Sequence, residues 1–125
     1  MTRKALTKNA SIRNAPSKGD IVLLDFNPQS GHEQAGSRPG LVISSKDFNS
    51  RTGFAFICPV TSQVKGYPFE VAVEGAKKTK GVILADQMKS LDWLARNVKS
   101  VDCVSPACVQ QVVALVGVIL YATEA

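Results

Sequence analysis

The sequence is poor in the side chains on which most hydrolytic and metal centres depend. It contains one histidine, which excludes a ribonuclease site built on two histidines and argues against a histidine-rich zinc site. Its three cysteines are an odd number without CxxC spacing, so neither a disulfide framework nor a zinc knuckle is expected. No Walker A or glycine-rich dinucleotide motif is present. We therefore expect neither a metal nor a cofactor.

Long apolar runs are missing as well. No run approaches the ~20 residues that a membrane-spanning helix needs, and residues 1–18 lack the hydrophobic centre of a signal peptide. Cys58 lies in an apolar run, where a free thiol usually acts as a small core residue, and we extend that interpretation to Cys103 and Cys108. Together these features predict a cytoplasmic protein that does not contact a membrane.

Acidic residues are absent from the beginning of the chain, and this absence locates the net charge of +5. The basic residues that precede the first acidic residue, Asp20, are Arg3, Lys4, Lys8, Arg13 and Lys18. From residue 19 onward, the chain has ten basic and ten acidic residues, so their charges balance. We therefore expect residues 1–17 to be a flexible basic tail and residues 18–125 to be a single domain that is nearly neutral. A site for an anionic polymer in that domain must depend on local placement of cations.

The hydrophobic pattern of the domain predicts several short strands followed by one helix. The expected strands cover residues 21–26, 40–44, 54–60, 69–74 and 82–85, with further short strands within residues 86–103. Ser105 and Pro106 have the residue types of an N-cap and a first helical position. The core-facing stripe expected for this helix is Val109, Val112, Val113, Val116, Ile119 and Leu120. The fold class is mainly β with α, a small and strongly curved barrel with a C-terminal helix.

A polar segment at residues 27–39 is long for a loop in a domain of this size. It contains His32, Glu33, Gln34 and Arg38, and so combines a base, an acid, an amide and a guanidinium. An arginine suits phosphate recognition because its planar fork can bond two phosphoryl oxygens. The alternative is a solvated loop in which Arg38 pairs with a nearby carboxylate, and composition alone favours that alternative.

A second polar segment follows the strand at residues 54–60. Thr61 and Ser62 could bond a phosphate or a base edge, and Lys65 could contact the nucleic-acid backbone. Ordinary turn chemistry, in which these hydroxyls cap backbone groups, is the alternative. Tyr67 could stack on a base.

The third segment comprises Asp86, Gln87 and Lys89. The Gln87 amide could read a base edge, whereas Asp86 could instead brace a loop. Trp93 could stack on a base, but its neighbours Leu91 and Leu94 favour a core position.

Four blocks of this sequence, taken in order, resemble the MazF/PemK toxins. The blocks are KGDIVLLDFNP, GHEQAGSRPGLVIS, CPVTSQVKGYPFEV and GVILADQMKSLDW. The resemblance implies a small SH3-like, CcdB-like barrel that forms a homodimer and cleaves single-stranded RNA at short sequences without a metal. It also implies a cognate antitoxin with a disordered acidic segment.

The resemblance assigns roles to particular residues of the three segments. By position it implies catalytic roles for Arg38, Thr61 and Glu33. The residues that it places along the RNA are His32, Gln34, Ser62, Lys65 and Gln87, and Lys89 is a further candidate for the same role. One branch of the family has a basic residue two positions before the Asp of Asp86-Gln87, and its catalytic assignment does not transfer because Leu84 stands there.

Two other functions remain open on the sequence alone. CcdB-type toxins share this small barrel but poison DNA gyrase and cleave nothing. A non-catalytic SH3-like RNA-binding module is the second alternative. Arg38 and Thr61 favour the nuclease over both.

Overall fold

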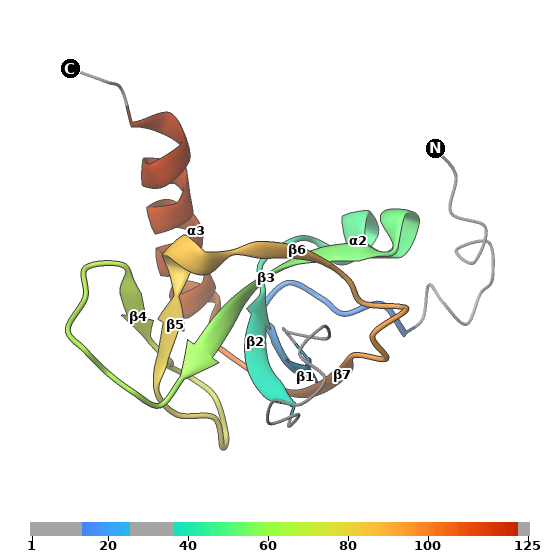
Figure 1. Ribbon diagram of the computed structural model, residues 1–125, viewed down its shortest axis with the longest axis horizontal. Helices are drawn as coiled ribbons and strands as arrows, with labels where there is room; N and C mark the ends of the chain where they lie inside the picture. The colour runs from blue at the N-terminus through green and yellow to red at the C-terminus, as the bar shows by residue number, and fades with distance from the viewer. Residues whose placement is uncertain (1–13, 26–36, 123–125) are drawn as a thin grey trace, which may run out of the picture.

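The computed structural model describes residues 14–25 and 37–122, which form an antiparallel sheet with two α-helices (Figure 1). The strands are β1 (Asp20–Leu24), β2 (Arg38–Val42), β3 (Phe54–Thr61), β4 (Glu70–Ala72), β5 (Val82–Leu84), β6 (Lys89–Asp92) and β7 (Lys99–Cys103). The helices are α2 (Lys46–Thr52) and α3 (Pro106–Tyr121), and a 3-10 turn, η2 (Ala85–Gln87), links β5 to β6. The predicted class, mainly β with a C-terminal helix, is confirmed.

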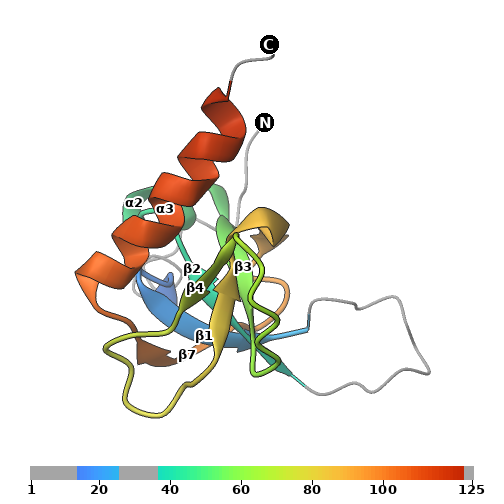
Figure 2. The same cartoon turned by 90° about the vertical axis from the view of Figure 1, so that its left-hand side faces the viewer.

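Strand β3 organises the sheet, whose order is β4-β5-β3-β2-β1-β7 with β6 also paired to β3. The first half of β3 pairs with β6 from Phe54 to Ile57, and its end pairs with β5 at Val60 and Thr61. One long strand therefore serves two partners along one edge while β2 occupies the other. The result is the strongly curved sheet seen in Figures 1 and 2.

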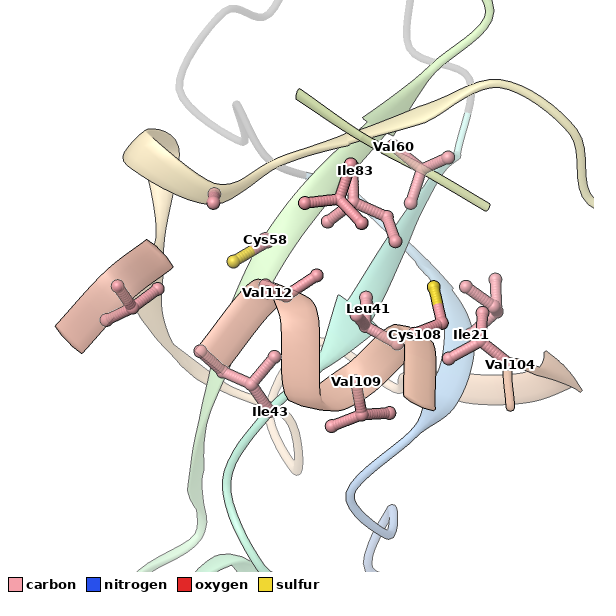
Figure 3. Close-up of a cluster of buried hydrophobic side chains, with 13 residues drawn as sticks. Ile21, Leu41, Ile43, Cys58, Val60, Ile83, Val104, Cys108, Val109 and Val112 are labelled. Atoms are coloured by element: carbon pink, nitrogen blue, oxygen red, sulfur yellow. The ribbon is translucent and has the colours of Figure 1, made fainter. Parts of the chain in front are cut away.

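Both faces of the sheet are covered at its centre. Ile57 and Cys58 are consecutive and fully buried, and successive side chains of a strand point to opposite faces. Cys58 belongs to the core beneath α3, where it lies with Val112 and Ile83 (Figure 3). Ile57 belongs to the second core, around Trp93. The core interpretation of the cysteines is confirmed for Cys58 and Cys108, whereas Cys103 is exposed, and all three are free thiols.

Helix α3 begins as predicted, because the Ser105 side chain accepts a hydrogen bond from the Cys108 N–H and Pro106 is the first helical residue. The predicted core stripe is correct for Val109, Val112 and Val116. It is wrong for Val113, Ile119 and Leu120, which are exposed. Val113 lies off the line of the buried valines, and the last turns of α3 extend beyond the sheet (Figures 1 and 2).

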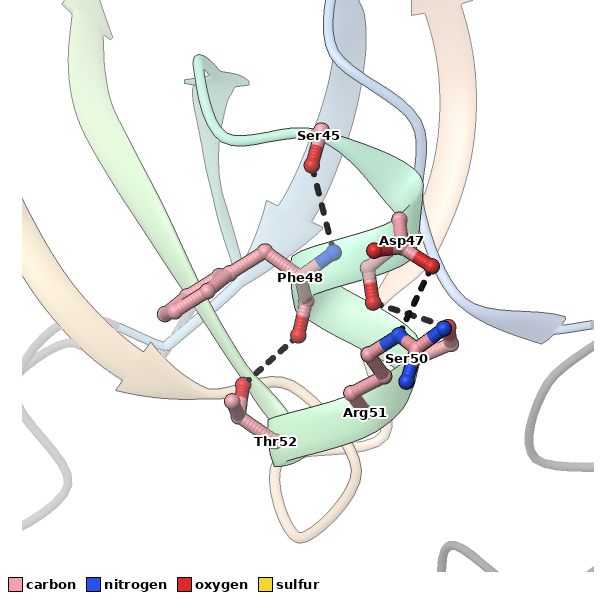
Figure 4. Close-up of polar contacts among 6 residues, drawn as sticks. All are labelled: Ser45, Asp47, Phe48, Ser50, Arg51 and Thr52. Carbon is pink, nitrogen blue, oxygen red and sulfur yellow. Dashed lines mark hydrogen bonds and ion pairs between the residues drawn. The ribbon is translucent and has the colours of Figure 1, made fainter.

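Helix α2 is a short helix that is capped at both ends. The Ser45 hydroxyl accepts a hydrogen bond from the Phe48 N–H at its start (Figure 4). Gly53 ends the helix with a φ of 79°. Asp47 and Arg51 form an exposed pair one turn apart.

Asn49 of α2 is fully buried and joins three parts of the chain. Its amide nitrogen donates to the Pro16 carbonyl at 2.9 Å, and its backbone carbonyl accepts from the Trp93 indole at 2.8 Å. The core interpretation of Trp93 is thereby confirmed, since its side chain is only 3% exposed. Ala15 and Pro16 are also buried, so packing extends into the stretch that was predicted to be tail. Residues 1–13 lie outside the described part.

Strand bounds differ from the sequence predictions by a few residues. The strand expected at residues 69–74 is reduced to Glu70–Ala72, and the one expected at 40–44 begins earlier, at Arg38. The described helices include none that is long and apolar enough to cross a membrane.

Candidate active site

A groove of about 400 Å³ opens where β2 begins and β3 ends. The loop after β3, the 3-10 turn η2 and the start of β6 complete its walls. Its lining residues are Arg38, Pro59, Val60, Thr61, Gln63, Lys65, Tyr67, Glu70, Leu84, Asp86, Gln87 and Lys89. Parts of all three polar segments identified in the sequence therefore meet in one place.

Arg38 and Thr61 lie on neighbouring strands, and both line the groove. The β2–β3 ladder pairs Gly40 with Pro59, and extending this antiparallel register by two residues brings Arg38 opposite Thr61. Both side chains share the face of Gly40 and Pro59, because residues two apart point the same way. The Arg38 side chain is exposed, and on its other side the residue pairs with Leu24 of β1. The sheet thus places a guanidinium at the start of β2 and a hydroxyl at the end of the neighbouring strand β3.

The Thr61 hydroxyl is fixed by the chain that follows it. Its oxygen accepts a hydrogen bond from the Gln63 N–H at 3.1 Å. Because the oxygen acts as acceptor towards the backbone, the hydroxyl proton remains available for a ligand. This arrangement is the turn chemistry that the sequence offered as an alternative, and it is compatible with a site.

The loop between β3 and β4 carries Lys65 and Tyr67 and is bound at two points. The Glu70 carboxylate accepts hydrogen bonds from the N–H groups of Lys65 and Gly66, both at 3.1 Å. The Tyr67 hydroxyl donates to Asp86 at 2.9 Å. This bond, and the negative charge of Asp86, raise the pKa of the Tyr67 phenol. The two acidic residues of the groove are therefore engaged with its own loop.

The basic side chains that line the groove are Arg38, Lys65 and Lys89. Cys58 lies buried behind the groove, and burial, with a smaller contribution from Asp86, raises the pKa of its thiol to about 12. Such a thiol stays protonated at neutral pH and is a poor nucleophile. Within residues 14–25 and 37–122, no cluster of three histidine, cysteine or acidic side chains could hold a metal ion.

The groove brings together most of the site residues expected from sequence. Arg38, Thr61, Lys65, Gln87 and Lys89 line it, whereas Ser62 lies beside it without lining it. His32, Glu33 and Gln34 lie outside the described residues. Sequence reasoning missed the contribution of Glu70, whose partners become visible only once the loop is closed.

Comparisons with known proteins identify the family of the chain. A family model described as "PemK-like, MazF-like toxin of type II toxin-antitoxin system" matches residues 17–120. The chain belongs to this family. It is 43% identical to the endoribonuclease toxin MazF of Escherichia coli K12 over 108 residues, which are 86% of this chain and 96% of that protein. The family resemblance of the four sequence blocks is thereby confirmed.

Other members of the PemK/MazF family extend the match. The endoribonuclease PemK of Escherichia coli is 33% identical over 107 residues, covering 82% of this chain and 80% of that protein. A crystal structure of MazE-MazF from Deinococcus radiodurans superposes with a TM-score of 0.80 at 41% identity, covering 87% of this chain and 98% of that one. These relatives are thus similar to this chain in sequence, and the solved structure is similar to it in fold as well.

Proposed function

We propose that this chain is a sequence-specific, metal-independent endoribonuclease toxin that cleaves single-stranded RNA in the groove at the start of β2 and the end of β3. The observation that carries the proposal is that Arg38 of β2 and Thr61 of β3 line one groove, together with Lys65 and Lys89. The family membership and the endoribonuclease relatives support the same activity.

The chemistry needs few protein groups because RNA carries its own nucleophile. The ribose 2′-hydroxyl attacks the adjacent phosphorus, the bond to the 5′-oxygen breaks, and a 2′,3′-cyclic phosphate and a 5′-hydroxyl result. Subsequent opening of the cyclic product by water gives a 3′-phosphate. The enzyme must hold an in-line geometry and stabilise the charge that develops on the phosphoryl oxygens.

Two residues of the groove suit that task. The Arg38 guanidinium can bond two phosphoryl oxygens at once. The Thr61 hydroxyl can donate to a phosphoryl oxygen, since its own oxygen already accepts from Gln63. Arginine is a poor proton donor, because its ordinary pKa exceeds about 12. We therefore assign charge stabilisation to Arg38 and leave proton transfer to Glu33 or His32.

The remaining expected RNA contacts complete this proposal. The RNA on either side of the scissile phosphate would contact Gln34, Lys65, Gln87 and Lys89. Ser62 would lie at the rim of the groove. Lysines contribute affinity through the phosphates, whereas amides such as that of Gln87 can read base edges.

Control of the toxin is proposed to come from a cognate antitoxin. The Deinococcus radiodurans relative was crystallised as MazE-MazF, a complex with a second protein. For this chain we propose a cytoplasmic homodimer inhibited by an antitoxin whose disordered acidic segment occupies the groove. Such a segment would meet the same three cations as RNA does, and it would order as it binds.

The alternatives, a gyrase poison of the CcdB type and a non-catalytic RNA-binding module, cleave no RNA. Digestion of a long RNA in the presence of EDTA separates them from the nuclease. We expect discrete fragments with 5′-hydroxyl ends whose junctions share one short sequence. Intact RNA under conditions in which the protein is folded would refute the proposed activity.

A further inference from the structure

The wall of the groove formed by the β3–β4 loop presents a cation and an aromatic ring. Both Lys65 and Tyr67 line the groove, and the Tyr67 side chain is 46% exposed. The antiparallel β4–β5 ladder pairs Glu70 with Leu84 and continues as a hydrogen bond from the Ala85 N–H to the Phe69 carbonyl. This register brings Tyr67 close to Asp86, on the turn that follows β5.

The Tyr67 side chain has two contacts, a hydrogen bond from its hydroxyl and a contact of its ring with the Phe69 ring. The hydroxyl donates to Asp86 at 2.9 Å, and the Phe69 ring lies at 6.0 Å with an interplanar angle of 59°. The adjacent backbone is also closed, since the Tyr67 carbonyl accepts from the Glu70 N–H. A half-exposed ring that is already immobilised loses little conformational freedom when a flat ligand stacks on it. This is the property that a base-stacking platform requires.

Lys65, the cation on this wall of the groove, is held through its backbone. Glu70 accepts the N–H groups of Lys65 and Gly66, and Gly66 has a φ of 75°, in the left-handed region. The loop is therefore fixed at this turn while the Lys65 side chain remains exposed at the groove. A fixed ring and a cation on the same wall of the groove suit the base and the phosphate of a nucleotide.

We propose that Tyr67 and Lys65 form a nucleotide subsite, in which a base of the RNA stacks on the Tyr67 ring and its phosphate meets the Lys65 ammonium. Asp86 and Glu70 are its positioning residues. The subsite rests on the proposed endoribonuclease function and specifies how the groove holds RNA beside Arg38 and Thr61. Because every base has a stacking face, the subsite contributes affinity without selecting a particular base.

Binding of a non-cleavable RNA, with deoxyribose at the scissile position, tests the subsite directly. Stacking on one aromatic ring is commonly worth a factor of about ten or more in affinity, so Tyr67→Ala should weaken binding by about tenfold. In the unaltered protein, an abasic nucleotide at one position should cause the same loss, and exchange among the four bases there should not. Tyr121→Ala, which removes an exposed tyrosine of α3 outside the groove, should bind as the parent does.

Combining the abasic RNA with the Tyr67→Ala variant shows whether the base removed from the RNA is the one that stacks on Tyr67. If Tyr67 and that base interact, the abasic RNA loses little additional affinity towards Tyr67→Ala, because the contact is already gone. The subsite would be overturned if the affinity losses from Tyr67→Ala and from the abasic nucleotide multiplied when combined. It would also be overturned if Tyr67→Ala bound the RNA with parental affinity. Folding is checked by the thermal midpoint of each variant, and the exposed position of Tyr67 favours folded variants.

The role of Asp86 is tested through Tyr67. If Asp86 positions the ring, Asp86→Ala and Tyr67→Phe should each raise KM several-fold with little change in kcat. The double variant should be no worse than the more affected single variant. The pH profile of kcat should be unchanged. A large loss of kcat from Asp86→Ala that persists beside Tyr67→Phe would show that Asp86 acts on the reacting atoms and would overturn its positioning role.

These outcomes separate the subsite from the activity itself. Loss of cleavage in Arg38→Ala together with parental RNA affinity in Tyr67→Ala would contradict the subsite and leave the nuclease standing. A folded parent protein that neither binds nor cleaves RNA would overturn both.

Discussion

Gly81 lies directly against the backbone of Thr61. A Cβ atom at Gly81 would collide with the Thr61 carbonyl oxygen and would come within 3.1 Å of the Ser62 Cα. Gly81 also has a φ of 119°, which side chains other than glycine rarely adopt. The position of the Thr61 hydroxyl therefore depends on the absence of a side chain on the neighbouring chain segment.

Gly81→Ala should consequently reduce turnover by more than its loss of stability explains. The added methyl group displaces the end of β3 and moves Thr61 relative to Arg38, and displacements of about 1 Å can cost a hundredfold in rate. Gly19→Ala is the control, because Gly19 also has a positive φ, of 97°, but its Cβ would meet Val109 at 3.4 Å and the Val104 carbonyl oxygen at 4.0 Å, which are ordinary contacts. Turnover and thermal midpoint of both variants are to be compared. Parental turnover in a folded Gly81→Ala protein would show that the close approach is unimportant.

Arg38→Ala should lower kcat by about two to three orders of magnitude, as loss of one preorganised charge donor commonly does. Arg38→Lys should recover little of this loss, because a lysine cannot bond two phosphoryl oxygens. Arg51→Ala, which breaks only the exposed pair with Asp47, is the control and should retain parental turnover. Single-turnover cleavage of a short RNA measures all three, and near-parental activity of Arg38→Ala would remove Arg38 from the site.

Thr61→Ala should also lower kcat strongly, whereas Thr61→Ser, which keeps the hydroxyl and its bond to the Gln63 N–H, should retain most of it. The comparison separates the hydroxyl from the methyl group of the side chain. Equal losses in the two variants would indicate that the methyl contact, and not hydrogen bonding to phosphate, accounts for the effect of Thr61.

Asp102 of β7 stabilises the β4–β5 loop, which ends at Gly81. Its carboxylate accepts the N–H groups of Lys77, Lys78 and Thr79, and the first two bonds contribute most to lowering its pKa well below the ordinary range. A lowered pKa stabilises the folded state at pH values above the unfolded pKa of about 4, and this contribution is lost as the pH falls towards the folded value.

Asp102→Asn should therefore lower the thermal midpoint by a constant amount between pH 8 and pH 5. The difference from the parent should shrink below about pH 4, because the carboxylate of the unfolded parent then takes up a proton while that of the folded parent stays ionised. Asp47→Asn, which alters an exposed helical pair, is the control and should have a small effect. A difference that is unchanged at pH 2 would show that charge is not what Asp102 contributes.

Removal of residues 1–13 should reduce RNA affinity modestly and lower its salt dependence without changing the cleavage sequence. The segment carries four of the basic residues that precede Asp20, and phosphate contacts set the salt slope of binding. Base-edge contacts set specificity, and they are assigned to the groove. Fragment-end sequencing after digestion by the truncated protein measures the second effect. An altered cleavage sequence would mean that the segment takes part in recognition.

The elements of this fold were largely predictable, because each has a local signal. Ser105-Pro106 and the valines at 109, 112 and 116 mark the start and the inner face of α3. The exposed end of α3 was not predictable, since the length of the sheet beneath a helix is a property of the tertiary fold. Apolar residues there continue the pattern of the buried part although the sheet has ended.

Several of the residues that line the groove were singled out from the sequence, but their arrangement was not. Arg38 and Thr61 each stood out, yet only the register of β2 on β3 brings them together. The pairing of Tyr67 with Asp86 likewise depends on the β4–β5 ladder. Glu70 carries no sequence signal of its loop-fixing role, because its partners are backbone N–H groups, which every non-proline residue has.

Cleavage of matched RNA substrates that differ only at the scissile ribose tests the proposed mechanism most directly. Both are incubated with the protein in EDTA, one with ribose and one with deoxyribose at that position. The mechanism predicts that the two bind with similar affinity and that only the ribose substrate is cut, leaving a cyclic phosphate and a 5′-hydroxyl. Cleavage of the deoxyribose substrate at the normal rate would contradict attack by the 2′-hydroxyl, and with it the role assigned here to Arg38 and Thr61.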